Sequence, residues 1–199
     1  MIKCEVNVCA VISRAASEKT SKDGQKFMSF GVKLTVTGRD NTSKDMEISV
    51  STDAIDFPYA IGQRVQISGI MNVLTKDERI YYNLRAEKID PAKKEIDSID
   101  GTMEFLGKTS KRGIEEKNDK KGNPFKAFSA FSTHKEGDKA EFTWVRFLYF
   151  NPKEGEDFLK ESAYIRATGV IQPNVYNNAL TLDCRVNEVA PWELEKKGV

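Results

Sequence analysis

The sequence predicts an all-β protein made of two tandem five-stranded barrels, each with a short helix between its third and fourth strands. Three observations predict it: apolar and polar residues alternate over long stretches, turn-forming segments separate these stretches, and a pattern of residues recurs about 100 positions later. Alternation with a period of two is typical of strands with one buried face. Recurrence at a fixed offset indicates a duplicated unit.

The strands of the first copy follow one another in a regular order. The alternating segments are CEVNVCAVIS, SFGVKLTV, MEISVS, RVQISGI and IYYNLRAEKI, and turn-rich segments such as SKDGQ and TKDE separate them. A short helix is expected between the third and fourth strands, at residues 53–62, and its counterpart in the second copy at residues 152–162. Strands of this length hide their edges by closing into a barrel, and this order of elements is that of the OB-fold.

The second copy follows the first at a nearly constant offset. RVQISGIMNV (64–73) corresponds to YIRATGVIQP (164–173) at an offset of 100, and DGQKFMSFGV corresponds to KGNPFKAFSA at an offset of 98. The matching segments keep the same order in both halves. We therefore predict a first OB-fold at residues 1–92, a second at 99–191 and a short C-terminal tail at 192–199, with a polar linker between the folds.

Composition excludes several classes of protein. Charged residues make up 31% of the chain and hydrophobic residues 39%, and no apolar run approaches the about 20 residues of a membrane span. The alternating N-terminal segment is unlike a signal peptide. The three cysteines (Cys4, Cys9 and Cys184) lack metal-ligand spacing, so we expect reduced structural thiols in a cytoplasmic protein, with no metal, no cofactor and no membrane partner.

The sequence carries no motif that would indicate catalysis. It lacks the HExxH, GxSxG and Walker patterns, and its one histidine, His134, lies in a polar turn. We therefore do not expect an enzyme.

The segment TWVRFLYF (143–150) carries two sets of side chains that face opposite sides of a strand. One set is Thr143, Val145, Phe147 and Tyr149, and the other is Trp144, Arg146, Leu148 and Phe150. An unpaired arginine inside a small barrel would cost several kcal/mol, so we expect the second set to face solvent. Trp144, Arg146 and Phe150 would then form a platform on which the bases of a single strand stack. A dimer interface, which also favours Trp, Phe and Arg, is the alternative that this spacing leaves open.

Three segments of the second copy, NPFKAFSAFST, TWVRFLYFN and YIRATGVIQPNVY, occur in that order between residues 123 and 176. In this order they resemble the bacterial single-stranded DNA-binding protein family, whose third strand reads Trp-x-Arg-x-x-x-Phe and whose fourth strand ends in glycine. Trp144, Arg146, Phe150 and Gly169 occupy these positions. The resemblance implies binding of single-stranded DNA, largely without sequence preference, to protect it in replication, recombination or repair. It also implies a homodimer that brings four OB-folds together.

The family's acidic C-terminal tail has no counterpart in PWELEKKGV, where this chain ends. We therefore do not expect partners to be recruited through such a tail. Its absence favours a phage or mobile-element origin, in which case the protein would act in the host cytoplasm.

Other residues of the second copy are candidates for contact with DNA. Phe131 faces outward or marks a bulge, Arg166 is expected to face outward beside the third strand, and Tyr176 lies in an Asn-rich hairpin. The connection between the first two strands is rich in basic residues, which is typical of a solvated loop but flanks the binding face in an OB-fold. These residues are Lys108, Lys111, Arg112, Lys120, Lys121 and Lys126.

The first copy departs from this pattern. Its third strand places Glu47, Ser49 and Ser51 where the second copy has Trp144, Arg146 and Leu148. A carboxylate repels phosphate, so we expect a weakened binding face here. The subsidiary candidates that remain are Lys33, Tyr81 and Arg85.

Two other functions remain open from the sequence. The two folds could serve as a protein-interaction scaffold or subunit of a replication or mobile-element complex. They could also bind RNA, because stacking platforms tolerate either sugar.

Overall fold

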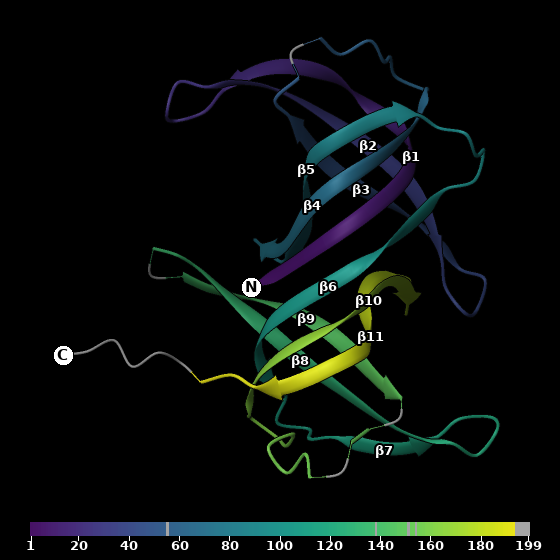
Figure 1. Cartoon of the computed structure of the whole chain (residues 1–199), viewed down its shortest axis with the longest axis vertical. Coiled ribbons are helices and arrows are strands. Elements are labelled where there is room, and N and C mark those ends of the chain that lie inside the picture. The colour runs from purple at the N-terminus through teal and green to yellow at the C-terminus, as the bar shows by residue number, and fades with distance from the viewer. Residues whose placement is uncertain (55, 138, 151, 154, 194–199) are drawn as a thin grey trace.

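The computed structural model describes residues 1–54, 56–137, 139–150, 152–153 and 155–193, and these residues form strands, turns and loops but no helix (Figure 1). The strands are β1 (Ile2–Thr20), β2 (Lys26–Thr37), β3 (Ser43–Thr52), β4 (Arg64–Lys76), β5 (Arg79–Pro91), β6 (Ser98–Thr109), β7 (Glu115–Asn118), β8 (Pro124–Glu136), β9 (Lys139–Phe150), β10 (Tyr164–Tyr176) and β11 (Ala179–Pro191). The prediction of an all-β protein is confirmed.

Hydrogen-bonded strands close into two barrels. The first runs β1-β2-β3-β5-β4 and returns to β1, and the second runs β6-β8-β9-β11-β10 and returns to β6. In each barrel one pair is parallel, β3 with β5 and β9 with β11. The same strand order therefore occurs twice, as the internal repeat predicts. Between the barrels, β5 ends at Pro91 and β6 begins at Ser98.

Strand pairing also joins the two barrels to each other. β1 and β6 pair antiparallel from Ile2 opposite Phe105 to Cys9 opposite Ser98, so all strands belong to one continuous sheet. The two strands lie side by side where the barrels meet (Figure 1). A Cβ atom at Gly101 would lie only 2.1 Å from the carbonyl oxygen of the facing β1 strand, so this close approach requires glycine. The sequence predicted a linker here and not this pairing.

Aromatic side chains fill the second barrel. The ring of Phe128 stacks on that of Phe147 with 5.0 Å between centroids, and Phe105 meets Phe147 edge-on at 4.9 Å. All three side chains are buried. In the first barrel Phe30 and Val50 hold the positions of Phe128 and Phe147 and are also buried. Alternate residues of each strand point into the barrel, and their side chains form its core.

β4 and β10 each carry a glycine opposite a bulge in the next strand, β5 or β11. The pairing with the next strand shifts at Gly69 in β4 and at Gly169 in β10. A Cβ atom would lie 2.1 Å from the Arg85 carbonyl oxygen at the first position and 2.2 Å from the Arg185 carbonyl oxygen at the second. The expectation that the fourth strand ends at Gly169 is wrong. A bulge bends a strand without ending its ladder, and β10 continues to Tyr176.

The short helices expected between the third and fourth strands are absent from the described residues of both segments, 53–62 and 152–162. Pro58 lies inside the first segment and lacks the N–H that a helix interior requires. In the second segment Gly155 and Ser162 have φ values of 78° and 56°, which are outside the right-handed helical region. Residues 55, 151 and 154 are outside the described part of the chain.

The second copy has one strand more than the sequence predicted. β7 pairs with the start of β8, from Glu115 opposite Ala127 to Asn118 opposite Pro124, within the connection expected to be a loop. The turn between them is closed by Asp119, whose carboxylate accepts hydrogen bonds from two backbone N–H groups at 2.8 and 2.9 Å. All four residues of β7 are exposed. Without a buried face the strand produces no alternation, and the sequence pattern missed it.

The cysteines are free and buried, and burial raises the pKa of the Cys4 and Cys184 thiols to about 12. This agrees with the predicted reduced structural thiols. Among the described residues no helix is long and apolar enough to cross a membrane. No group of three or more His, Cys, Asp or Glu side chains in this part of the chain is placed to hold a metal ion.

Candidate nucleic-acid interface

β9 presents alternate side chains to the two sides of the barrel wall. Val145 and Phe147 are buried inside, whereas Trp144 is 50% exposed and Arg146 is exposed. This is the parity that the sequence predicted. Leu148 is the exception, because it has the outward parity but is buried in the wall.

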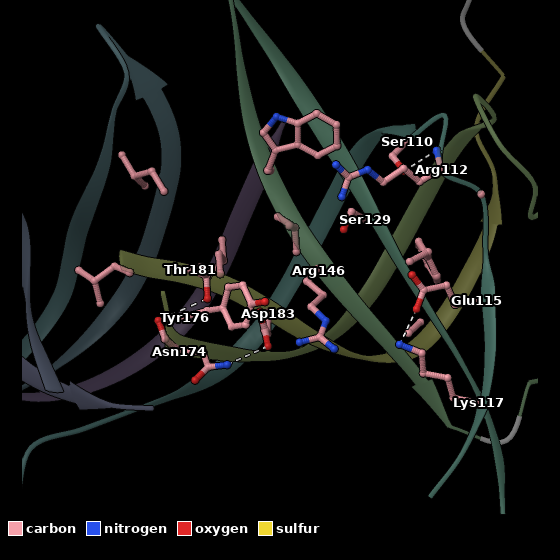
Figure 2. A pocket seen from close by; sticks show the side chains of 18 residues that line it. Ser110, Arg112, Glu115, Lys117, Ser129, Arg146, Asn174, Tyr176, Thr181 and Asp183 are labelled. Atoms are coloured by element: carbon pink, nitrogen blue, oxygen red, sulfur yellow. Dashed lines mark hydrogen bonds and ion pairs between the residues drawn. The ribbon is translucent and has the colours of Figure 1, made fainter. Parts of the chain in front are cut away.

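A groove of about 590 Å³ lies over the outer face of β8 and β9. Trp144 and Arg146 line its floor. One wall is β7 with the turn before it, and the other is the β10–β11 hairpin. Figure 2 shows Arg146 between these walls, with Tyr176 and Asp183 on one side and Glu115 on the other. The polar and aromatic residues of the walls are Ser110, Arg112, Glu115, Lys117, Asn174, Tyr176, Thr181 and Asp183.

Arg146 provides the central positive charge of the groove and lies near two carboxylates. The pKa of Glu115 is lowered, first by its ion pair with Lys117 and to a smaller extent by Arg146. Burial raises the pKa of Asp183, and a hydrogen bond that the Asn174 side-chain amide donates at 3.3 Å opposes this rise, as does the charge of Arg146. The net charge that an anion meets beside Arg146 therefore depends on whether Asp183 is protonated.

Trp144 belongs to a cluster of rings on the outer face. Phe131 lies opposite it on β8, with 5.0 Å between ring centroids, and Phe131 also meets Phe142 edge-on at 5.0 Å. The pairing of β8 with β9 has no register shift, so Phe131 faces outward without a bulge. Phe142 is 47% exposed and was not among the predicted residues. The parity of Trp144, two residues further along, would have identified it.

Phe150 lies on the outer face at the opposite end of β9 and is half-buried. Its ring stacks against Phe125 with 5.0 Å between centroids, and the Arg185 guanidinium lies 5.1 Å from its centroid. Phe150 does not line the groove. The tertiary structure therefore separates the three residues of the expected platform into a pair, Trp144 with Arg146, and a more distant ring.

The predicted basic residues are distributed over several surfaces. Arg112 lines the groove. Lys108 lies on the outer face of β6, opposite Phe131. Lys126 has the inward parity of β8 and is half-buried, so it does not share the face of Trp144. The others are exposed on turns and do not line the groove; they are Lys111, Lys120 and Lys121.

The expectation that Arg166 lies beside the third strand is wrong. Arg166 on β10 is opposite Leu106 on β6 and Ala190 on β11. In the ring order the fifth strand separates the fourth from the third. Arg166 is exposed, but it lines a separate hollow of about 350 Å³ together with Glu104 and Glu188.

The candidates of the first barrel are exposed, and both cations among them have carboxylate partners. Lys33 Nζ lies 2.8 Å from Asp45, and Arg85 Nη2 lies 2.8 Å from Asp53. Tyr81 is 40% exposed. Partnered cations on an exposed surface attract phosphate less than free ones, which agrees with the weakened face expected here.

The first barrel also contributes to the groove of the second, which the sequence did not predict. Ile80, at the start of β5, lines the groove. It reaches there because the β4–β5 hairpin extends to β9, where the Thr75 backbone N–H donates to Thr143 Oγ1 at 2.7 Å. The polar hairpin residues Asn174, Thr181 and Asp183 were missed as well. Their proximity to the Asn-rich turn was the available signal, whereas nothing local in the sequence places Ile80.

Comparison with solved structures gives matches at low identity. The wild-type single-stranded DNA binding protein from Thermus aquaticus matches with a TM-score of 0.50 and 9% identity, over 100% of this chain and 96% of that chain. A deletion mutant of the same protein matches with a TM-score of 0.48 and 10% identity, over 100% and 98% of the two chains. Fission yeast Pot1, crystallised with single-stranded DNA, matches with a TM-score of 0.31 and 9% identity, over 98% of this chain and 85% of that chain.

No protein-family model and no curated protein matches the chain. At 9% identity the Thermus aquaticus match concerns the fold. The match extends over both barrels, so the resemblance seen in the sequence is confirmed for the fold.

Proposed function

We propose that this protein binds single-stranded DNA, largely without sequence preference, in the groove of its second barrel. The observation that carries the proposal is the outward pair of Trp144 and Arg146 on the floor of a groove about 590 Å³ in volume. Base–ring stacking is worth about 1–3 kcal/mol per base and tolerates every base. Arg146 and Arg112 provide charge for the phosphates. The similarity in fold to a single-stranded DNA binding protein supports the same function.

The exposed ring of Trp144 favours a single strand over a duplex. A stacking platform requires an unpaired base whose face is free, and such a face is hidden inside a double helix. In the cell the protein would coat and protect single strands during replication, recombination or repair, in the cytoplasm. We propose no catalytic activity and no cofactor, and we propose that residues 1–92 and 99–191 are the two OB-folds.

Tryptophan fluorescence tests the proposal directly. Poly(dT) should quench the emission of Trp144, and duplex DNA of equal length should not. Trp192 is the second tryptophan, so the Trp192→Phe variant isolates the Trp144 signal. Equal quenching by the duplex, or none by poly(dT), would remove the proposed function.

A salt titration separates this function from a protein-interaction scaffold. Binding of single strands weakens steeply with salt through counterion release, whereas a contact made by aromatic residues with another protein changes little. Competition by poly(U) against poly(dT) decides between RNA and DNA. A homodimer with four OB-folds is the assembly we propose, and sedimentation of the free protein measures it.

A further inference from the structure

A row of outward side chains crosses four neighbouring strands of the second barrel. Trp144 on β9 is opposite Phe131 on β8, Phe131 is opposite Lys108 on β6, and Lys108 is opposite Tyr164 on β10. Neighbouring strands lie about 4.8 Å apart, so the row extends roughly 14 Å around the barrel wall from Trp144. At about 3.4 Å per nucleotide, this corresponds to about four nucleotides of a stacked single strand.

Tyr164 ends this row as an exposed ring. It is 42% exposed, close to the 50% of Trp144. The Trp192 ring packs against one side of it, edge-on, with 6.0 Å between centroids, and the Trp192 backbone N–H donates to the Tyr164 carbonyl at 3.0 Å. The ring is therefore held by its contact with Trp192 and still presents surface to solvent, which a stacking platform needs.

Lys108 supplies the positive charge of the row. Its Nζ atom lies 5.2 Å from the Tyr164 centroid. A cation over an exposed ring contributes less than a stacked base does, so a base can displace the ammonium, which then pairs with phosphate. Carboxylates lie further along the wall, where Glu104 and Glu188 share a hollow with Arg166. The surface that attracts phosphate therefore ends at these two carboxylates.

We propose that a single strand leaving the groove at Trp144 continues over Phe131 and Lys108 and stacks a base on Tyr164. The binding site then extends from the outer face of β9 around the barrel wall to β10. This inference rests on the proposed function and extends it. Its occupant is single-stranded nucleic acid, because the row is continuous with the groove and carries the charge that complements phosphate.

The test compares oligo(dT) of two lengths, about 3 and about 24 nucleotides, which bracket the sites of about 4–16 nucleotides seen in OB-folds. Tyr164→Ala should weaken binding of the long oligonucleotide by about fivefold or more, the lower limit for losing one base–ring stack. Binding of the short one, which is shorter than the span of about four nucleotides from Trp144 to Tyr164, should not change. Tyr164→Phe should bind both as the wild type does.

Val170→Ala is the matched control. Val170 faces outward on the same strand, is 39% exposed, and lies off the row opposite Thr102. It should leave both affinities unchanged. Thermal unfolding of each variant checks that the barrel remains folded. In a Trp144→Phe background, emission from Trp192 should change with the long oligonucleotide alone, which reads out the Tyr164 end of the row without relying on affinity.

Two outcomes overturn the inference while leaving the proposed function intact. In the first, the wild type binds both oligonucleotides, the Tyr164→Ala variant binds each with the same affinity as the wild type, and Trp192 emission does not change. The other is a Tyr164→Ala variant that loses self-association but not DNA affinity, which would make the row an interface between copies of this chain. If the wild type binds neither oligonucleotide, the proposed function itself fails.

Discussion

The outer faces of the second and third strands distinguish the two barrels. In the first barrel the outward cross-strand pairs are Ser29 with Ser51, Gly31 with Ser49 and Lys33 with Glu47. In the second barrel the equivalent pairs are Ala127 with Leu148, Ser129 with Arg146 and Phe131 with Trp144. The backbone pairing is the same, but one face carries small and oppositely charged side chains, and the other carries rings and an unpartnered guanidinium among the described contacts.

The inner faces of the same strands are alike. Phe30 and Phe128 hold equivalent positions on β2 and β8, and both are buried. Closing the barrel depends on these inward residues, because burial of apolar surface dominates the free energy of folding. The outward residues are not needed for closure. The two copies can therefore keep one fold while a single copy keeps the face that we propose binds DNA.

The largest expected effect tests what the barrels share. Gly69→Ala places a Cβ atom 2.1 Å from a facing carbonyl oxygen, and Gly169→Ala places one 2.2 Å from the equivalent oxygen. Relief requires the backbone to shift, so each should lower the free energy of unfolding by about 2–3 kcal/mol. Urea unfolding followed by circular dichroism measures this. A variant that keeps wild-type stability at either glycine would show that the two bulges are not equivalent.

Trp144→Ala tests where the barrels differ. Loss of one stacking platform should weaken binding of oligo(dT) by about 1–3 kcal/mol, or roughly fivefold to 150-fold. Glu47→Ala changes the equivalent position of the first barrel, opposite Lys33, and should have little effect. Fluorescence anisotropy with labelled oligo(dT) measures both. Similar losses from both variants would contradict the asymmetry between the copies.

Arg146→Ala tests the proposed phosphate contact. Removing one contact should lower the slope of log affinity against log salt by about 0.7, the value for one phosphate of a single strand. Ser49 is the equivalent residue of the first barrel, and Ser49→Ala should leave the slope unchanged. The slope comes from affinities measured at several salt concentrations. An unchanged slope in Arg146→Ala would mean that the guanidinium contacts no phosphate.

The smallest expected effect concerns Asp183, which faces Arg146 across the β9–β11 pair, whereas Asn83 faces Ser49 in the first barrel. Burial raises the pKa of Asp183, so folding favours its protonated form. The contribution of the protonated carboxyl to stability is fully present below the ordinary aspartate pKa of about 4, and it is lost as the pH rises through the raised pKa. At neutral pH the ionised carboxylate also opposes an anion in the groove.

Asp183→Asn should therefore raise the free energy of unfolding at neutral pH and strengthen DNA binding by a modest factor. The gain should disappear in acid, where the wild-type carboxyl is protonated. The affinity of the wild type for DNA should rise as the pH falls through the raised pKa of Asp183. The affinity of the variant should stay constant over the same range. Affinity measured from neutral to acidic pH checks this. A variant with the pH profile of the wild type would remove Asp183 from the electrostatics of the groove.

Parity was the most reliable guide that the sequence provided to the candidate site. It placed Trp144 and Arg146 on the outside and Phe147 on the inside, as the structure has them, and it left Phe131 open between an outward position and a bulge. Parity depends only on the geometry of one strand. It failed to place Arg166, because the neighbours of a strand depend on the order of the whole ring. It also missed β7, which has no buried face and therefore no alternation.

The sequence by itself determined the class of fold, the duplication, the outward parity of Trp144 and Arg146 and the difference between the two outer faces, because each of these depends on local spacing. Only the tertiary structure decided which outward residues meet. It paired β1 with β6, extended the first barrel's hairpin to β9, and aligned Trp144 with Phe131, Lys108 and Tyr164. These contacts join residues that are distant in the chain. They depend on strand order and register, which no local pattern specifies.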